Sequence, residues 1–380
     1  MDKNTKKMIL MELIFSIFKS FVLIFVNIYL WKTGKSIKAV AIFNIFNYIA
    51  AFISFYIGNV IALKSSKLNY LLSSSFFIML FAITAIMGDE ISKYAVLIGI
   101  LGGFGDGLFY FNLNFFQASE LKRNQVDSFM SAVGIVSKLS SIITPIISGL
   151  IIEKFGFAHM TYVLIGLLIL QIINAISLPN RKIEYLAKVN LKKIFKEKDY
   201  KKVLSTHLIH TPFGQFIIMA NSVFLYSFAK SESLMGVLNS AFAVSAILFY
   251  YIYMKMQRRY PRKKLMMVGA VALALSVSLL FKPSFMTFVL FSMTISMGDA
   301  FFNKPLTGIQ VYSAKKYGSN DEELLGNLVF RVSLLTISRS VFYILILLFY
   351  VDSSSFIFKA LLVYNILSPI LSYTLIREEM

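Results

Sequence analysis

Apolar runs of about 20 residues or more follow one another along the whole chain, and only short polar turns separate them. A helix of that length crosses the ~30 Å hydrocarbon core of a bilayer. Because lipid offers no partner to backbone N–H and C=O groups, a spanning segment must satisfy them internally. A membrane β-barrel would need short alternating segments, and these runs are too long and too evenly apolar. The sequence therefore predicts an all-α polytopic membrane protein.

Composition excludes several functional classes. The chain is 57% hydrophobic and 15% charged, whereas soluble domains are about 25% charged. Its net charge of +19 could suggest a nucleic-acid partner, but the basic residues lie mainly in the turns, so we expect none. There is no cysteine, and the three histidines form no metal-ligand motif with nearby acids. No phosphate-binding Gly-rich loop is present. We therefore expect no metal, no cofactor and no enzymatic activity.

Twelve transmembrane helices account for the apolar runs. The first run contains Glu12 and Lys19, is longer than the apolar region of a signal sequence and has no cleavage-site pattern, so we interpret it as a retained span. A polar, basic segment, 180–203, divides the chain into an N-terminal six-helix bundle, 1–179, and a C-terminal one, 204–380. The predicted spans are 8–31, 38–63, 69–88, 94–118, 126–152, 157–179, 204–229, 233–256, 265–281, 284–310, 322–350 and 354–376.

The distribution of lysine and arginine predicts the orientation. Basic residues gather in alternate loops, which favours a cell-membrane protein with both termini in the cytoplasm. One predicted outer loop is an exception to this distribution, because it contains three lysines, Lys32, Lys35 and Lys38. The segment 180–203 would then be a cytoplasmic linker whose lysines lie against the anionic lipids of the inner leaflet.

Charged residues inside the apolar runs repeat at a fixed offset. Asp106 and Lys138 lie in the first half, Asp299 and Arg331 in the second, and 299 − 106 = 331 − 138 = 193. Charged turns follow both acidic spans, at Glu120–Arg123 and Lys315–Lys316. This repeat predicts two pseudo-symmetric six-helix halves.

The pattern resembles the major facilitator superfamily. Two six-span halves, a basic central loop, and basic turns after spans two and eight are typical of that family. Gly58, Lys64 and Lys67 match its first turn, although Ala62 occupies the usual acidic position. Span five resembles the family's antiporter motif in part, at Ser140, Thr144, Pro145, Ser148 and Gly149. The resemblance implies a secondary transporter that works by alternating access around a midplane site.

Several ionisable residues lie near the predicted midplane, where a charge costs ~2.5–3.5 kcal/mol and needs a partner or water. In a structural interpretation, Asp106 pairs with Lys138 and Asp299 pairs with Arg331. In a functional interpretation, one or both of Asp106 and Asp299 exchange protons while basic and aromatic side chains bind the substrate. These substrate-binding candidates are Lys19, Lys138, Arg331, Arg339, Phe109 and Tyr110.

Two further features are open to two interpretations each. His207 and His210 share a helix face before Pro212; we expect interfacial polar residues, and the alternative is a proton relay. Lys304–Pro305 is expected to break span ten just inside Asp299, either as a gate or as plain helix geometry.

The excess of basic over acidic residues at the midplane favours an anionic substrate, since arginine holds a carboxylate or phosphate with two hydrogen bonds. We therefore predict a monomeric, proton-coupled carrier of a small organic solute, with an anionic metabolite as the favoured substrate. The alternatives are a multidrug-type proton antiporter, a non-transporting scaffold or receptor, and a lipid translocator of the same fold.

Overall fold

The computed structural model describes residues 3–119, 123–180, 182–350 and 355–377, and regular structure in these residues is helical. Eleven stretches are long and apolar enough to cross a membrane. One of them, Ser66–Asn114, holds two helices that pack against each other, α4 (Ser66–Met87) and most of α5 (Ala95–Ser119). The chain is therefore a multi-pass membrane protein, as predicted. The turn predicted at Glu120–Arg123 falls largely outside the described residues.

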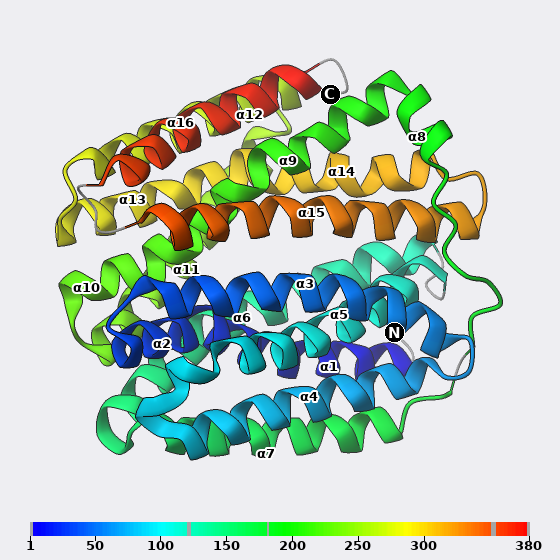
Figure 1. The fold of residues 1–380 in the computed structure, drawn as a ribbon. Helices are drawn as coiled ribbons and strands as arrows, with labels where there is room; N and C mark the ends of the chain where they lie inside the picture. Colours follow the sequence, from blue (N-terminus) through cyan, green and yellow to red (C-terminus); the bar gives the residue numbers. More distant parts are fainter. Residues whose placement is uncertain (1–2, 120–122, 181, 351–354, 378–380) are drawn as a thin grey trace. The chain divides into compact units, whose positions relative to one another are not determined.

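The chain forms two compact units. The N-terminal unit is Met1–Leu186 together with Ser231–Val237, and the C-terminal unit is Ala187–Lys230 together with Leu238–Met380. In the N-terminal unit, α3 packs on α5, α4 on α5 and α7, and α1 on α6 (Figure 1). Its further elements are α1 (Lys3–Phe21), η1 (Val22–Val26), α2 (Asn27–Gly34), α3 (Ile37–Ala62), η2 (Gly88–Tyr94), α6 (Arg123–Phe155) and α7 (Phe157–Ile176).

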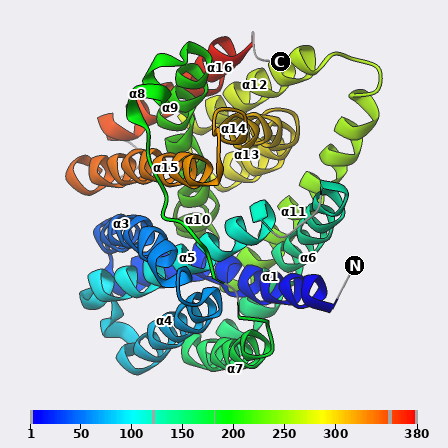
Figure 2. The ribbon, with the colours of Figure 1, turned by 90° about the vertical axis from the view of Figure 1, so that its right-hand side faces the viewer.

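In the C-terminal unit, α12 packs against α13 and α16, while α9 packs against α15 and α16 (Figure 2). The first residues of α11 group with the N-terminal unit. The elements are α8 (Leu191–Lys196), α9 (Lys198–Met219), η3 (Ala220–Phe224), α10 (Leu225–Ala229), α11 (Glu232–Met256), α12 (Arg262–Ser278), η4 (Leu279–Phe281), α13 (Phe285–Gly298), η5 (Asp299–Asn303), α14 (Lys304–Lys316), α15 (Asp321–Phe349) and α16 (Phe356–Ile376).

The glycines around Asp106 let α5 approach its neighbours closely. A Cβ at Gly107 would lie 2.0 Å from Ser54 Oγ, and one at Gly105 would lie 2.5 Å from the Phe77 ring. Gly103 is as restricted, since its Cβ would meet Asn47 O at 2.2 Å. Small residues at such contacts are typical of helix packing in membranes. The packing of α5 on α3 and α4 therefore fixes the turn that carries Asp106.

Within the part of the chain that the structure describes, three spans contain a π-helical segment. The segment η1 lies in the first span and η3 in the first span of the C-terminal half, at an offset of 220 − 22 = 198 residues. The third, η5, begins at Asp299 and ends just before Lys304–Pro305. The regular α-helix of span ten is thus interrupted beside Lys304–Pro305, but by a π-helical segment through which the chain stays helical.

Candidate functional site

Lys19 of α1 and Asp106 of α5 form an ion pair inside the N-terminal unit. Lys19 Nζ donates to Asp106 Oδ2, and the two side chains are 18% and 6% exposed. The structural interpretation of the sequence predicted an ion pair between Asp106 and Lys138. That prediction is wrong, because Asp106 pairs with Lys19. Sequence offsets between neighbouring spans could not reveal that the ammonium of span one reaches the acid of span four.

Lys138 and the two aromatic candidates lie near this pair in different surroundings. Ser16 and Ser137 Oγ atoms are 3.1 Å apart, so the residue before Lys138 faces α1. The ring of Phe109 is fully buried and stacks on Phe15 at 3.7 Å between centroids. Tyr110 is 38% exposed. The two neighbouring aromatic residues thus face different environments, one in the bundle core and one at its surface.

A basic cluster lies in the C-terminal unit. Arg331 and Arg339 are half-buried on α15 and are near enough to interact electrostatically with each other and with His207 of α9. Nε of Arg331 is buried and has no hydrogen-bond partner within the described part of the chain. His207 is only 1% exposed, so its ring lies inside the bundle rather than on its surface.

Asp299 accepts hydrogen bonds from two neutral donors. Tyr250 of α11 donates its hydroxyl to Asp299 Oδ2, and Asn303 Nδ2 donates to Asp299 Oδ1 over 3.3 Å. Asn303 Oδ1 in turn lies 2.8 Å from His210 Nε2, and His210 Nδ1 lies 3.1 Å from Ser368 Oγ. This polar network joins α9, α11, η5 and α16. His210 is therefore bonded through both ring nitrogens within this network.

Sequence reasoning missed Tyr250, Asn303 and Ser368. The spacing of Asp299 and Asn303, one helical turn apart, was the available signal. Tyr250 and Ser368 gave no signal, since each meets its partner across a large sequence separation: 49 residues from Tyr250 to Asp299, and 158 from Ser368 to His210.

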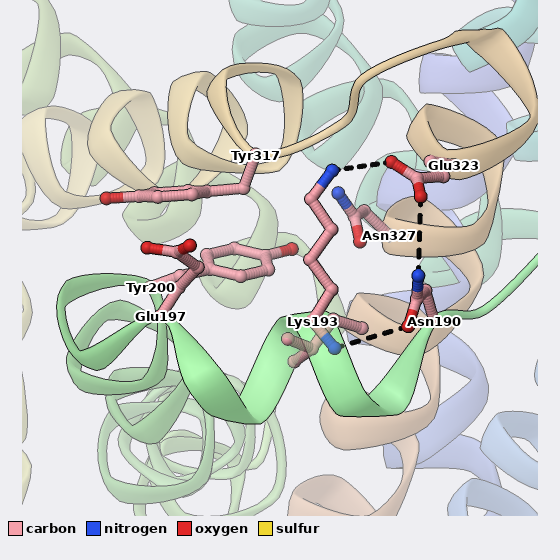
Figure 3. Close-up of a pocket in the computed structure, with 8 residues that line it drawn as sticks. Asn190, Lys193, Glu197, Tyr200, Tyr317, Glu323 and Asn327 are labelled. Carbon is pink, nitrogen blue, oxygen red and sulfur yellow. Dashed lines mark hydrogen bonds and ion pairs between the residues drawn. The ribbon is translucent and has the colours of Figure 1, made fainter.

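The central linker is held against the C-terminal unit by a clasp, defined here as the contacts of Lys188–Lys196 with the start of α15 (Figure 3). Lys193 Nζ lies 2.7 Å from Glu323 Oε2, and the Lys188 N–H donates to Glu322 O over 3.0 Å. Beside them Ile194 is buried. The hollow between these residues holds no space for a water molecule. It is a packing contact with no room for a ligand.

A roomier cavity of about 200 Å³ lies in the N-terminal unit. Its charged lining includes an ion pair, Lys32 to Glu232 at 2.9 Å, and Glu153, whose carboxylate accepts the Ser233 N–H over 2.9 Å. Both signs of charge are therefore engaged there. Among the described residues, no group of histidine, aspartate or glutamate could hold a metal ion.

Two curated proteins are similar in sequence, and neither has an assigned function. The uncharacterized protein YqgE of Bacillus subtilis (strain 168) is 24% identical over 284 residues, 72% of this chain and 66% of that protein. The uncharacterized protein in the sodM 3' region of Geobacillus stearothermophilus is 27% identical over 146 residues, 37% of this chain and 67% of that protein. The chain thus spans about two thirds of each relative. No family model matches it.

Solved structures match almost the whole chain. The nucleoside transporter NupG superposes with a TM-score of 0.71 at 16% identity, covering 99% of this chain and 98% of that one. A D-xylose–proton symporter gives 0.73 at 12%, covering 97% and 96%. The peptide transporter POT, in complex with sulfate, gives 0.74 at 11%, covering 98% and 94%. With its apolar spans and its charged residues inside them, the chain has the fold of the major facilitator-type transporters.

Proposed function

We propose that this chain is a secondary active transporter that moves a small organic solute across the cell membrane by alternating access, coupled to protons. The observation that carries the proposal is the presence of charged groups inside the apolar spans of both units: the Lys19–Asp106 pair, Asp299, and the Arg331–Arg339 cluster. Ionisable residues within membrane spans are costly and usually mark a transport pathway.

The charge balance favours an anionic solute. Asp106 is paired with Lys19, and Asp299 accepts hydrogen bonds from neutral side chains. The Arg331–Arg339 cluster concentrates positive charge, and the buried Arg331 Nε has a donor to offer. A carboxylate or phosphate would satisfy that donor. We assign the main substrate contacts to Arg331 and Arg339. The remaining substrate-binding candidates are Lys19, Lys138, Phe109 and Tyr110. Proton coupling is assigned to Asp106 and Asp299.

The proposed architecture is a monomer with twelve spans in two pseudo-symmetric six-helix halves, 1–179 and 204–380. The linker, 180–203, would lie in the cytoplasm with both termini. Its outward-facing lysines, such as Lys192 and Lys196, are exposed and suit contact with anionic lipids of the inner leaflet.

A ligand screen tests the substrate class. Purified protein is heated with carboxylates, organophosphates, sugars and organic cations, since a bound ligand at about 100 times its Kd stabilises the folded form by about 2.7 kcal/mol. We expect stabilisation by anions, abolished in Arg331→Gln and retained in Lys359→Gln, which removes an exposed charge from the same unit. Stabilisation by cations alone would contradict an anionic substrate and favour the multidrug alternative.

A second experiment separates the effect of the arginine's planar shape on anion binding from the effect of its charge. Arg339→Lys keeps the charge but loses the planar fork that binds an anion through two hydrogen bonds. We expect this variant to fold and to lose most anion uptake in proteoliposomes. Unchanged uptake in Arg339→Gln would remove Arg339 from the proposed site.

A further inference from the structure

Pro212 rearranges the backbone hydrogen bonds around His210. A proline has no N–H, so the carbonyl of Leu208, four residues earlier, loses its helical donor. Ser338 of α15 donates to that carbonyl instead, over 2.9 Å. The next carbonyl, Ile209 O, accepts the hydroxyl of Tyr364 at 2.7 Å and that of Ser368 at 2.9 Å, both from α16. His210 thus lies in a part of α9 where side-chain hydroxyls bond to the backbone.

The Nε2 side of His210 must carry a hydrogen. Asn303 uses its amide nitrogen to donate to Asp299, so its carbonyl oxygen is the atom 2.8 Å from His210 Nε2. An amide oxygen accepts and cannot donate. Nε2 therefore donates, which fixes the tautomer of the neutral ring and leaves Nδ1 as the nitrogen that can take up a proton.

The Nδ1 side is built to serve both protonation states. When the ring is neutral, Nδ1 accepts the hydroxyl hydrogen of Ser368, 3.1 Å away, while Ile209 O keeps its bond from Tyr364. When the ring is protonated, Nδ1–H donates to Ser368 Oγ, whose hydrogen turns to Ile209 O. One hydroxyl rotation exchanges the two states, and no buried polar group loses its partner in either.

Charged and titratable groups reach His210 from several elements. Asn303 links the ring to the carboxylate of Asp299, which can balance the charge of an imidazolium. The tyrosines on α11 and α16 are neutral donors to this network. Titratable or charged groups on the packed elements include Asp299, Tyr250, Tyr364, His207, Arg331 and Arg339.

We propose that His210 is a second proton-binding residue of the C-terminal unit, coupled to Asp299 through Asn303. A proton from water bonds to Nδ1, and the carboxylate of Asp299 balances the imidazolium charge. The inference rests on the proposed proton coupling. It extends the proton-binding site of the C-terminal unit from the carboxylate of Asp299 to the pair of Asp299 and His210. Protonation of His210 and ionisation of Asp299 then favour each other.

Histidine-selective ¹⁵N NMR of the protein in lipid nanodiscs tests the proposal without substrate. The chain has only three histidines, and His210→Gln assigns the signal. We expect the Nε2–H tautomer at high pH and a doubly protonated ring at low pH. Asp299→Asn should lower the midpoint by at least about one pH unit, a tenfold change in proton affinity. A ring that stays neutral from pH 9 to pH 5, or a midpoint that Asp299→Asn does not move, would overturn the proposal.

Matched serine variants test the hydroxyl. Ser368→Ala should shift the midpoint or the tautomer balance of His210, whereas Ser372→Ala, which removes a buried hydroxyl one turn along α16, should not. Equal effects of the two variants would contradict the assigned role of Ser368. The outcome does not depend on transport: a titrating ring in a protein that transports nothing would refute the proposed function alone, and proton-driven uptake with a non-titrating ring would refute this inference alone.

Discussion

The pair of Lys19 and Asp106 shows how a charge is accommodated inside an apolar bundle. Oδ1 of Asp106 is buried and unbonded within the described residues, while Oδ2 accepts the lysine ammonium. Replacing a buried ion pair by apolar groups is often neutral, yet removing one partner leaves an uncompensated charge. Mutating one or both residues of this pair therefore tests which side chains are partners, and it says little about how much the pair contributes to the total stability.

A double-mutant comparison distinguishes this pair from the one that sequence spacing suggested. Asp106→Asn should destabilise the protein by about 3–5 kcal/mol because it strands the Lys19 ammonium. Adding Lys19→Met should recover most of that loss, and adding Lys138→Gln should recover little. Denaturant unfolding in detergent measures all four proteins. Recovery by the Lys138 variant instead would reverse the assignment.

For single residues, the sequence indicated which charged side chains lie inside apolar spans, but it did not indicate which side chains they contact. The offset of 193 residues identified Asp106 and Asp299, because costly charges in equivalent spans are conspicuous against an apolar background. Their partners depend on which helix faces come together, and a side-chain offset carries no such information. The role of His210 depends on hydroxyls of a helix more than 150 residues away.

Among the elements, α5 illustrates how glycine placement determines helix packing. A methyl group at Gly107 would lie 2.2 Å from Ala51 O as well as 2.0 Å from Ser54 Oγ, so backbone of α3 would have to move. Gly166 of α7 is exposed and its Cβ would meet nothing within 4 Å. These two helical glycines form a natural comparison.

We expect Gly107→Ala to destabilise the protein by at least the ~1–3 kcal/mol typical of overpacking. Gly166→Ala should be neutral or stabilise it by up to ~1 kcal/mol, because alanine is the better helix former. Thermal unfolding of both variants in the same detergent provides the measurement. A stable Gly107→Ala protein would mean that α3 and α5 are not packed as described.

The linker clasp makes an element-scale prediction of its own. Glu323 accepts the Lys193 ammonium and the Ser319 N–H, and its loss should release Lys188–Lys196 from α15. Amide hydrogen exchange in this segment should rise in Glu323→Ala. The exposed Lys192→Ala, on the same short helix, should leave exchange unchanged. Unaltered exchange in Glu323→Ala would show that apolar packing of Ile194 holds the linker without the ion pair.

The helical elements were largely predictable, and their irregularities were not. Each predicted span overlaps a helix or a helix with a short π or 3₁₀ segment, because a long apolar run in lipid has few alternatives to a helix. The π-helical segments were missed, since Val22–Val26 and Ala220–Phe224 have no proline or glycine to mark them. They depend on how neighbouring helices pack.

For the whole molecule, the two units differ in how they hold their acids. The π segments Val22–Val26 and Ala220–Phe224 are offset by 198 residues, and Asp106 and Asp299 by 193. Asp106 faces an ammonium, and Asp299 faces a tyrosine and an amide that leads to His210. Asp106 therefore lies beside a cation, whereas Asp299 belongs to the polar network that includes His210. The proposed second proton-binding residue rests on that network.

The orientation of the whole chain is the remaining prediction, and the absence of native cysteine makes it directly testable. Basic residues favour the cytoplasmic side, which places the linker inside and the turn at Lys282 outside. Glu184 and Lys282 are both exposed. A cysteine at Lys282 should react with an impermeant maleimide in intact cells, and one at Glu184 only after the membrane is opened. The reverse pattern would invert the topology, and with it the direction assigned to every loop.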